Sequence, residues 1–492
     1  MLSPKSLNTI HDLFATTRRE SDAPDNEGAD MPIESDVYEQ LAQLEYIYVD
    51  EQTATNVDDS YAMLEYEPIS LGDFFEGLAQ LATMGVVEVT DIVEAIHREI
   101  MLRPIGRFNE RSVKKWQRGI TGRIYGTIRY IMLLVGNNLS SGVRLYNNML
   151  SQKNVQPLPK SLRRLVNILN GVMGDHLVNH HNPLAVPMVL YDRYDYIQQR
   201  KISGRVIILC HGLCMSHLSW HVSKDHDLGE RLMSSQPNST ILYLNYNTGQ
   251  RISTNGRSLS KLLQDLVVNN PDIIHIDLIG HSMGGLVARS ALFYGKQQGF
   301  DWVKRVSNLV TLGSPHHGAS LERIGNFIQE MIAKLPFAGS LAKLGDLRSA
   351  GIIDLRHGSI RDADWQSLER RSVLPPEFRH PTPLPLHVRT YLIASTLVEG
   401  HYDSKAASLL GDGLVTVDSA LGEHTGDHAL LVPKGRTAVF YGVSHYNLLY
   451  SDRVHNQVIA WLSESDKSEA YPDDAISSSR IYSYPERLNV VV

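Results

Sequence analysis

The segment Leu278–Ser290, LIGHSMGGLVARS, constrains the fold of this 492-residue chain more than any other. It places Ser282 between Gly280 and Gly284, after the apolar run IIHIDLIG and before a stretch with helical character. A G-x-S-x-G pattern between a strand and a helix is typical of a tight elbow that presents a strained serine. Side chains at the two glycines would collide with neighbouring backbone. We expect Ser282 to be a nucleophile, and a glycine-rich turn with an incidental serine is the alternative.

Short apolar runs alternate with helical stretches around this elbow. The leucines of SLSKLLQDLVV, for example, fall on one helical face. Strands that alternate with helices predict βαβ units and a parallel sheet. The expected fold class is therefore α/β, with a mostly parallel central sheet flanked by helices over residues 188–463. The expected strands are Arg205–Cys210, Thr240–Tyr246, Ile273–Gly280, Val306–Gly313, Arg389–Ser395 and Thr437–Val443.

The remaining parts of the chain differ from this region in composition. Residues 1–68 are acidic and lack clear periodicity, so we expect them to be largely disordered. Residues 69–187 show apolar side chains at helical spacing and predict a helical extension, with helices that include Ile120–Leu134 and Val143–Leu150. Residues 464–492 are polar and serine-rich, and predict a loosely attached tail.

The charge of the chain bears on its partners. It carries 47 Lys and Arg against 54 Asp and Glu, a net charge of −7, so nucleic acid is not an expected partner. The basic segment 101–164 has Glu110 as its one acidic residue and makes peripheral membrane contact a hypothesis. Neutralisation of that segment by the acidic residues before it is the simpler interpretation.

The apolar runs and the cysteines of the chain predict its subcellular location. The N-terminus lacks the apolar core of a secretory signal, and the longest apolar run of the N-terminal half is Tyr130–Val135. A membrane-spanning helix needs ~20 such residues, so none is expected. Cys210 and Cys214 are too few for a disulfide framework, and we expect free thiols near a buried strand end. The expected location is cytoplasmic.

Two downstream segments offer partners for Ser282, because a serine hydroxyl needs a base and an oriented acid to become a nucleophile. GDGLVTVDSALG places Asp412 in a glycine turn, and FYGVSHYNLL places His445 directly after the last expected strand. Taken singly, Asp412 could be a turn former and His445 a surface residue. Their order and their positions after strands favour a triad with Ser282. Asp403, which lacks the glycine turn, and Asp418, in an expected helix, are rival acids.

An acyl-transfer intermediate also needs two N–H donors for its oxyanion. One expected donor is the backbone of Met283, directly after the nucleophile. The other expected donor is the backbone of Leu213, in the loop His211-Gly212-Leu213-Cys214 after the first parallel strand. Gly212 would let that loop approach the site, whereas His211 either orients the loop or simply ends the strand.

An insert between VSNLVTLG and RTYLIAS offers a cover for the site. Its helical stretch has one apolar face, and Pro336 and Gly339 are expected to end the helix. We expect either a lid within 319–360 that lines an acyl pocket or an amphipathic helix packed on the core, with equal weight. The residues of this apolar face are Ile324, Phe327, Ile328, Met331, Ile332 and Leu335.

The motifs HGL, GHSMGGLVAR, TLGSPHHGA, GDGLVTVDSALG and GVSHYNLL occur in the order of the α/β-hydrolase superfamily. The chain resembles its lipase and esterase branch, including bacterial triacylglycerol lipases and GPI-inositol-deacylase-like hydrolases. The resemblance implies Ser282 as nucleophile, His445 as general base, Asp412 as its acid, and the N–H groups of Met283 and Leu213 as oxyanion hole. It implies no cofactor.

The chain departs from this family at one position. Related lipases often carry His-x-Asp at the catalytic histidine, with the aspartate in a calcium site, whereas this chain has Asn447 there. No metal is therefore predicted. The adjacent His316 and His317 are expected to line a pocket rather than bind a metal.

The sequence thus predicts a serine hydrolase that cleaves carboxylic esters, lipid-like ones above all, through an acyl-enzyme. An acyltransferase or thioesterase on the same triad is one alternative. A non-catalytic interaction protein on a hydrolase scaffold is another, and the intact Ser282, Asp412 and His445 weigh against it. The acyl chain, the alcohol and the oligomeric state stay open.

Overall fold

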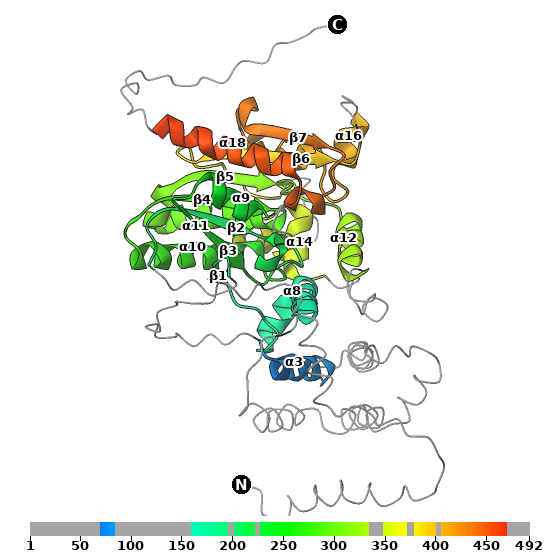
Figure 1. The fold of residues 1–492 in the computed structure, drawn as a ribbon. Coiled ribbons are helices and arrows are strands. Elements are labelled where there is room, and N and C mark those ends of the chain that lie inside the picture. Colours follow the sequence, from blue (N-terminus) through cyan, green and yellow to red (C-terminus); the bar gives the residue numbers. More distant parts are fainter. Residues whose placement is uncertain are drawn as a thin grey trace, which may run out of the picture. The chain divides into compact units, whose positions relative to one another are not determined.

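A computed structural model describes the central part of the chain (Figure 1). All described residues fall within one of the two units into which the chain divides. The acidic segment 1–68 and the expected helices Ile120–Leu134 and Val143–Leu150 lie outside the described residues. The described residues are 69–83, 158, 160–194, 201–221, 227–333, 348–370, 378–399 and 405–469.

The described strands form one seven-stranded sheet in the order β1-β3-β2-β4-β5-β6-β7. β1 pairs with β3 in antiparallel fashion, and every other pairing is parallel. The expected α/β class with a mostly parallel sheet is confirmed. The sequence analysis missed β1, because three residues are too short to show a period. The strands are β1 (Val189–Tyr191), β2 (Gly204–Cys210), β3 (Ser239–Asn245), β4 (Ile273–His281), β5 (Val306–Leu312), β6 (Arg389–Thr396) and β7 (Thr437–Tyr441).

Helices cover the sheet and extend its core. α10 packs on α11, α9 contacts α18, and α9 and α11 contact strands β3 and β4. The longer helices are α3 (Leu71–Thr83), α8 (Lys160–Asn179), α9 (Leu228–Ser235), α10 (Ile252–Asn269), α11 (Met283–Gln298), α12 (Leu321–Ala333), α14 (Ala350–His357), α15 (Asp362–Arg370) and α18 (Asp452–Glu469). The shorter ones are η4 (His217–Trp220), η6 (Asp301–Arg305), α16 (Lys405–Leu410), α17 (Val417–Ala420), η8 (Gly426–His428), η9 (Lys434–Arg436) and η10 (Tyr446–Leu449).

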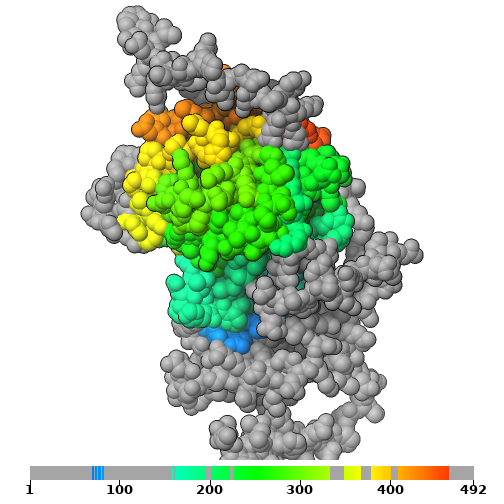
Figure 2. All heavy atoms as spheres, turned by 90° about the vertical axis from the view of Figure 1, so that its left-hand side faces the viewer, coloured from blue at the N-terminus to red at the C-terminus, as the bar shows by residue number. Residues whose placement is uncertain are grey.

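The core is continuous from the sheet to the helices that precede it. The inner part of β2, Val206–Cys210, is fully buried, as expected for a parallel strand with both faces covered. Leu165 and Leu177 of α8 and Phe74 of α3 belong to the same apolar cluster and are equally buried. In Figure 2, α8 lies directly below the green mass of the sheet and its helices. These contacts make α8 part of the packing that supports the sheet.

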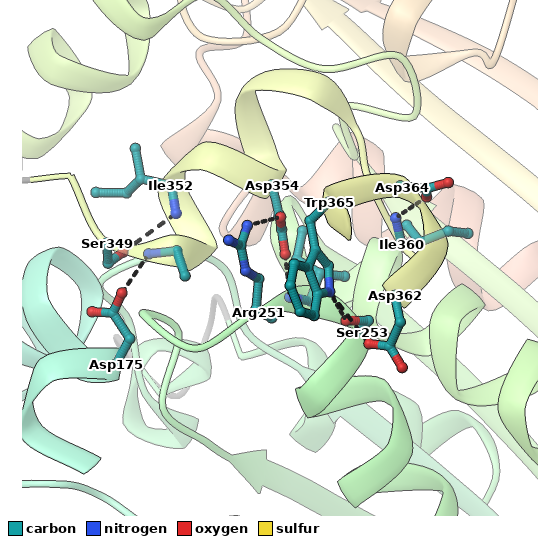
Figure 3. A network of polar contacts seen from close by, with 12 residues as sticks. Asp175, Arg251, Ser253, Ser349, Ile352, Asp354, Ile360, Asp362, Asp364 and Trp365 are labelled. Carbon is teal, nitrogen blue, oxygen red and sulfur yellow. Dashed lines mark hydrogen bonds and ion pairs between the residues drawn. The ribbon is translucent and has the colours of Figure 1, made fainter. Parts of the chain in front are cut away.

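The insert between β5 and β6 is fixed by polar contacts (Figure 3). Arg251, the residue before α10, pairs with Asp354 of α14 at 2.8 Å. Asp175 of α8 accepts a hydrogen bond from the backbone N–H of Ala350 at 2.8 Å. α14 is therefore held by both α8 and α10.

The C-terminal helix continues past the expected start of the tail. α18 runs to Glu469, whereas the polar composition predicts a tail from residue 464. Among the residues that the structure describes, no helix combines the length and apolar character that crossing a membrane requires.

Candidate active site

Ser282 occupies a strained elbow between β4 and α11. Its backbone has φ 53° and ψ −121°, a region that non-glycine residues rarely adopt. A Cβ at Gly280 would lie 2.3 Å from the nitrogen of Gly285, and a Cβ at Gly284 would lie 2.3 Å from the carbonyl oxygen of Cys210. Both positions therefore exclude a side chain, for the steric reason that the sequence analysis expects.

Asp412 and His445 form a buried pair beyond the ends of β6 and β7. Asp412 Oδ2 lies 2.7 Å from His445 Nδ1, and both side chains are at most 3% exposed. Asp412 Oδ1 accepts hydrogen bonds from the backbone N–H groups of Leu414 (2.9 Å) and Val415 (2.7 Å). Because the carboxylate is an acceptor, it favours the tautomer of a neutral imidazole with the proton on Nδ1 and Nε2 as an acceptor.

Ser282 and this pair meet around the residue that follows β5. The backbone N–H of Ser282 donates to Leu312 O at 2.9 Å. A Cβ at the next residue, Gly313, would lie 3.1 Å from Asp412 Oδ2 and 3.3 Å from His445 Nδ1. The three residues thus gather at the carboxyl edge of the sheet. Within the described part of the chain, neither Ser282 Oγ nor His445 Nε2 has a hydrogen-bond partner.

The rival acids are placed differently. Asp418 lies in α17, where its carboxylate accepts a hydrogen bond from the hydroxyl of Ser408. Asp403 lies outside the described residues. The carboxylate that the described structure pairs with His445 is that of Asp412.

The loop after β2 lies against the serine. A Cβ at Gly212 would lie 3.0 Å from the Cβ of Ser282. Leu213 is fully buried, and Met283 is the first residue of α11, where an N–H group has no partner in the helix. Among the described residues, the backbone N–H groups of Leu213 and Met283 donate to no protein acceptor. Both groups are therefore open to an acceptor beside Ser282.

α8 and the loop after β3 support this β2 loop. Cys214 has φ 60°, and its N–H donates to Thr248 Oγ1 at 3.1 Å. A Cβ at Gly171 of α8 would lie 2.2 Å from Cys214 Sγ. The Tyr246 hydroxyl donates to His211 O at 2.8 Å. The role of α8 was not predicted, because apolar spacing predicts a helix but not the loop on which it packs.

Burial decides the state of the neighbouring titratable groups. Cys210 and Cys214 are free and buried, as expected, and burial raises the pKa of the Cys210 thiol to about 12. Burial lowers the pKa of His211 to about 3, and it lowers the pKa of His281 well below its usual value. Both imidazoles are therefore neutral near pH 7. His281 instead contacts the backbone of the neighbouring histidine, with Nε2 3.0 Å from His445 O.

α12 packs beside His445. Phe327 is 7% exposed, and its ring centroid lies 5.5 Å from that of the His445 imidazole. Arg323 ties the helix to the end of α16, because its guanidinium donates to Leu409 O and Leu410 O, each at 2.9 Å. Met331 is partly buried in the same cluster, whereas Leu335 lies outside the described residues. The fully packed members of the expected apolar face are Ile324, Phe327, Ile328 and Ile332.

His316 and His317 follow β5 but do not join this group. His316 Nε2 lies 3.2 Å from Thr311 Oγ1, and its Nδ1 lies 3.2 Å from a guanidinium nitrogen of Arg289. His317 Nδ1 lies 3.2 Å from a guanidinium nitrogen of Arg379. The two imidazoles line a small pocket beside α11, with both arginines. Sequence reasoning missed Arg289, because nothing in the spacing of GGLVARS separates a buried arginine from an exposed one.

Three features together identify the fold. They are the strand order, the antiparallel first strand and the serine elbow. The chain has an α/β-hydrolase fold. The expected fold is thereby confirmed. Residues 201–424 match the family model of the PGAP1-like alpha/beta domain. No curated protein sequence matches the chain.

The solved structures to which this chain is similar include proteins named as lipases and esterases. The Bacillus licheniformis lipase BlEst2 in mature form is 17% identical, with 57% of this chain and 99% of that chain covered and a TM-score of 0.35. The carboxylesterase CesB from Bacillus subtilis is 13% identical, with coverage of 62% and 99% and a TM-score of 0.32. An esterase from Thermogutta terrifontis is 12% identical, with coverage of 56% and 93% and a TM-score of 0.30. The fold assignment rests on the topology and the elbow of this chain.

Proposed function

We propose that this α/β-hydrolase is a serine hydrolase that cleaves carboxylic esters. Ser282 is the nucleophile, His445 the general base and Asp412 the acid that orients it. The observation that carries the proposal is the buried Asp412–His445 pair, 2.7 Å apart, at the sheet edge that also presents the strained Ser282. A buried serine hydroxyl and imidazole nitrogen without partners are costly unless a reaction uses them.

The proposed reaction has two steps. In the first step, His445 Nε2 takes the proton from Ser282 Oγ as that oxygen attacks the ester carbonyl carbon. The N–H groups of Leu213 and Met283 then stabilise the oxyanion. Collapse of the intermediate breaks the bond to the alcohol, which leaves with the proton from His445. In the second step, water attacks the acyl-enzyme by the same route and releases the carboxylic acid.

The substrate class follows from what lies beside the base. The apolar face of α12 packs there, and Phe327 contacts His445. We infer that α12 is part of a cap and that its apolar side chains bound an acyl pocket. Lipid-like esters fit such a pocket, because apolar burial is the main source of affinity for an acyl chain.

The test is covalent labelling by a fluorophosphonate probe. The native chain should be labelled and Ser282→Ala should not, whereas Ser234→Ala, whose hydroxyl is exposed and bonds to Glu230 O, should label like the native chain. Equal labelling of the native chain and Ser282→Ala would falsify the proposal, as would a folded native chain that is not labelled. Hydrolysis of p-nitrophenyl esters of graded chain length then separates short-chain from lipid-like substrates.

The same acyl-enzyme could pass its acyl group to an alcohol or accept it from a thioester. Incubation of an activated ester with added glycerol distinguishes these outcomes. Free acid as the main product supports a hydrolase. A new glycerol ester as the main product would instead make the chain an acyltransferase.

A further inference from the structure

A second group of polar side chains lines a pocket beside α11. Arg289 lies seven residues after Ser282, which is two helical turns or ~10 Å along the helix axis. The pocket therefore lies apart from the serine. Its charged and titratable side chains include Arg289, Asp364, Arg379, His317, His380 and His428.

Arg289 is a buried cation that bonds to neutral acceptors. Its residue is 8% exposed. It donates to Thr382 O at 3.0 Å and contacts His316 Nδ1 at 3.2 Å. Burial keeps the imidazole of His316 neutral by lowering its pKa well below the usual value. Burial and the nearby Arg379 lower the pKa of Arg289 to about 10, against the opposite effect of Asp364, so the guanidinium is charged at neutral pH.

Asp364 also lines this pocket, and its carboxylate accepts hydrogen bonds from the backbone nearby (Figure 3). Its Oδ2 accepts hydrogen bonds from the backbone N–H groups of Ile360 and Arg361, both at 3.1 Å. Its Oδ1 accepts from the backbone N–H of His380 at 2.8 Å and lies 3.1 Å from His380 Nδ1. Within the described residues, no carboxylate forms a salt bridge with Arg289. A buried charge without such a partner is unfavourable unless a ligand supplies the opposite charge.

Arg379 is a second cation that lines the pocket. Its guanidinium donates to His316 O at 3.0 Å and lies 3.2 Å from His317 Nδ1. Like-charged Arg289 and Arg379 are close enough that the second lowers the pKa of the first. Both guanidinium groups line the pocket, so an anion placed between them would be attracted by both.

We infer that this pocket binds a phosphate group. Arginine guanidinium groups bind phosphate oxygens through charge-assisted hydrogen bonds, and donors from several directions suit a tetrahedral anion better than a planar one. His380 is exposed and His428 is half-buried, so these two lining residues open the pocket to solvent and a phosphate can enter there. The same chemistry is offered by free phosphate and by the headgroup of an anionic phospholipid.

The test is ligand-dependent thermal stability at constant ionic strength. Inorganic phosphate, in place of chloride, should raise the Tm of the native chain by about 2–4 °C at ten times its Kd. Arg289→Gln and Arg379→Gln should abolish this rise. Arg305→Gln is the matched control, because Arg305 also donates to backbone carbonyls, those of Pro271 and Ile273, but lies outside the pocket. It should respond to phosphate like the native chain.

A second measurement asks whether the phosphate group belongs to a lipid headgroup. The stability of the variant is measured as well, to exclude a folding defect. Vesicles of phosphatidylcholine with or without phosphatidic acid are sedimented with each protein. Binding that needs both phosphatidic acid and Arg289 identifies a headgroup, whereas a phosphate-dependent Tm alone identifies a free anion. In phosphate-free buffer, Arg289→Gln should be at least as stable as the native chain, because it removes a buried charge that forms no salt bridge within the described residues. Equal responses of native and variant chains, or none with either phosphate source, would overturn the inference.

Discussion

The ring of Phe327 meets the imidazole of His445 edge-on, with 5.5 Å between the centroids and 89° between the planes. Such edge-to-face pairs attract each other beyond their apolar burial. Phe327 belongs to the insert and His445 to the loop after β7, so the contact joins the proposed cap to the proposed base. The position of α12 and the environment of His445 are therefore linked.

Replacement of Phe327 by Ala should impair long-chain ester turnover more than short-chain turnover. The lost apolar contact should cost the long-chain substrate about 1–3 kcal/mol, or roughly ten- to a hundredfold in kcat/KM. Kinetics on p-nitrophenyl esters of graded length test this expectation. Phe300→Ala, at the residue before η6, is the control and should leave the chain-length profile unchanged. Equal losses on short and long esters would show that α12 has a structural role only.

Asp412→Asn should lower kcat by about 10⁴-fold, because an amide can hold the imidazole of His445 in the wrong tautomer. The turn itself should persist, since an amide oxygen can still accept from Leu414 and Val415. Steady-state kinetics should therefore show a large loss of kcat, whereas the Tm of the variant should stay close to that of the native chain. Asp418→Asn serves as control and should retain nearly full activity, and a comparable loss there would reopen the choice of acid.

Gly171→Ala should weaken catalysis through the loop that carries Leu213. The added Cβ would lie 2.2 Å from Cys214 Sγ and 3.0 Å from Cys214 Cα, so this loop must shift. Loss of one oxyanion donor costs about 10²–10³ in kcat, and a displaced donor should cost about tenfold or more. Gly435→Ala is the matched control, because nothing lies within 4 Å of its Cβ position. Native kcat in a folded Gly171→Ala variant would contradict this role of α8.

Most of the fold could be predicted from local sequence patterns. The strand-like runs match the parallel strands to within a few residues, since buried parallel strands are continuous apolar runs. The elbow was predictable because its two glycines have a steric cause that the spacing alone reveals. The antiparallel β1 was missed, because pairing with β3, rather than its own three residues, makes it a strand.

Contacts between distant segments could not be predicted in the same way. Residues 160–179 show helical spacing, but no pattern tells that Gly171 backs Cys214. The motif GHSMGGLVARS shows Arg289 as one more helix residue, and only the packing shows it buried beside Arg379. Whether a charged side chain is buried and paired depends on residues far away in the chain. Local patterns in one sequence do not show these neighbours.

Asp354 should make the stability of the chain depend on pH. Burial raises its pKa to about 7, against ~3.9 in an unfolded chain, although Arg251 and the N–H of Ile252 favour the carboxylate. The native state therefore holds a proton that the unfolded state lacks between about pH 4 and pH 7. Stability from this group is complete below the unfolded pKa and is lost as the pH rises through 7.

The comparison of the native chain with Asp354→Asn isolates this group. The free energy of unfolding of the native chain, relative to the variant, should fall by about 4 kcal/mol between pH 4 and pH 7, since three pKa units correspond to that amount. Urea unfolding across this range measures it. Asp362→Asn is the control: burial opposes ionisation of Asp362, but the hydrogen bonds from Arg257, Ser253 and Trp365 and the charge of Arg257 together outweigh it and lower the pKa. That variant should track the native chain above pH 5, and a flat difference for Asp354→Asn would show that Arg251 keeps Asp354 ionised throughout.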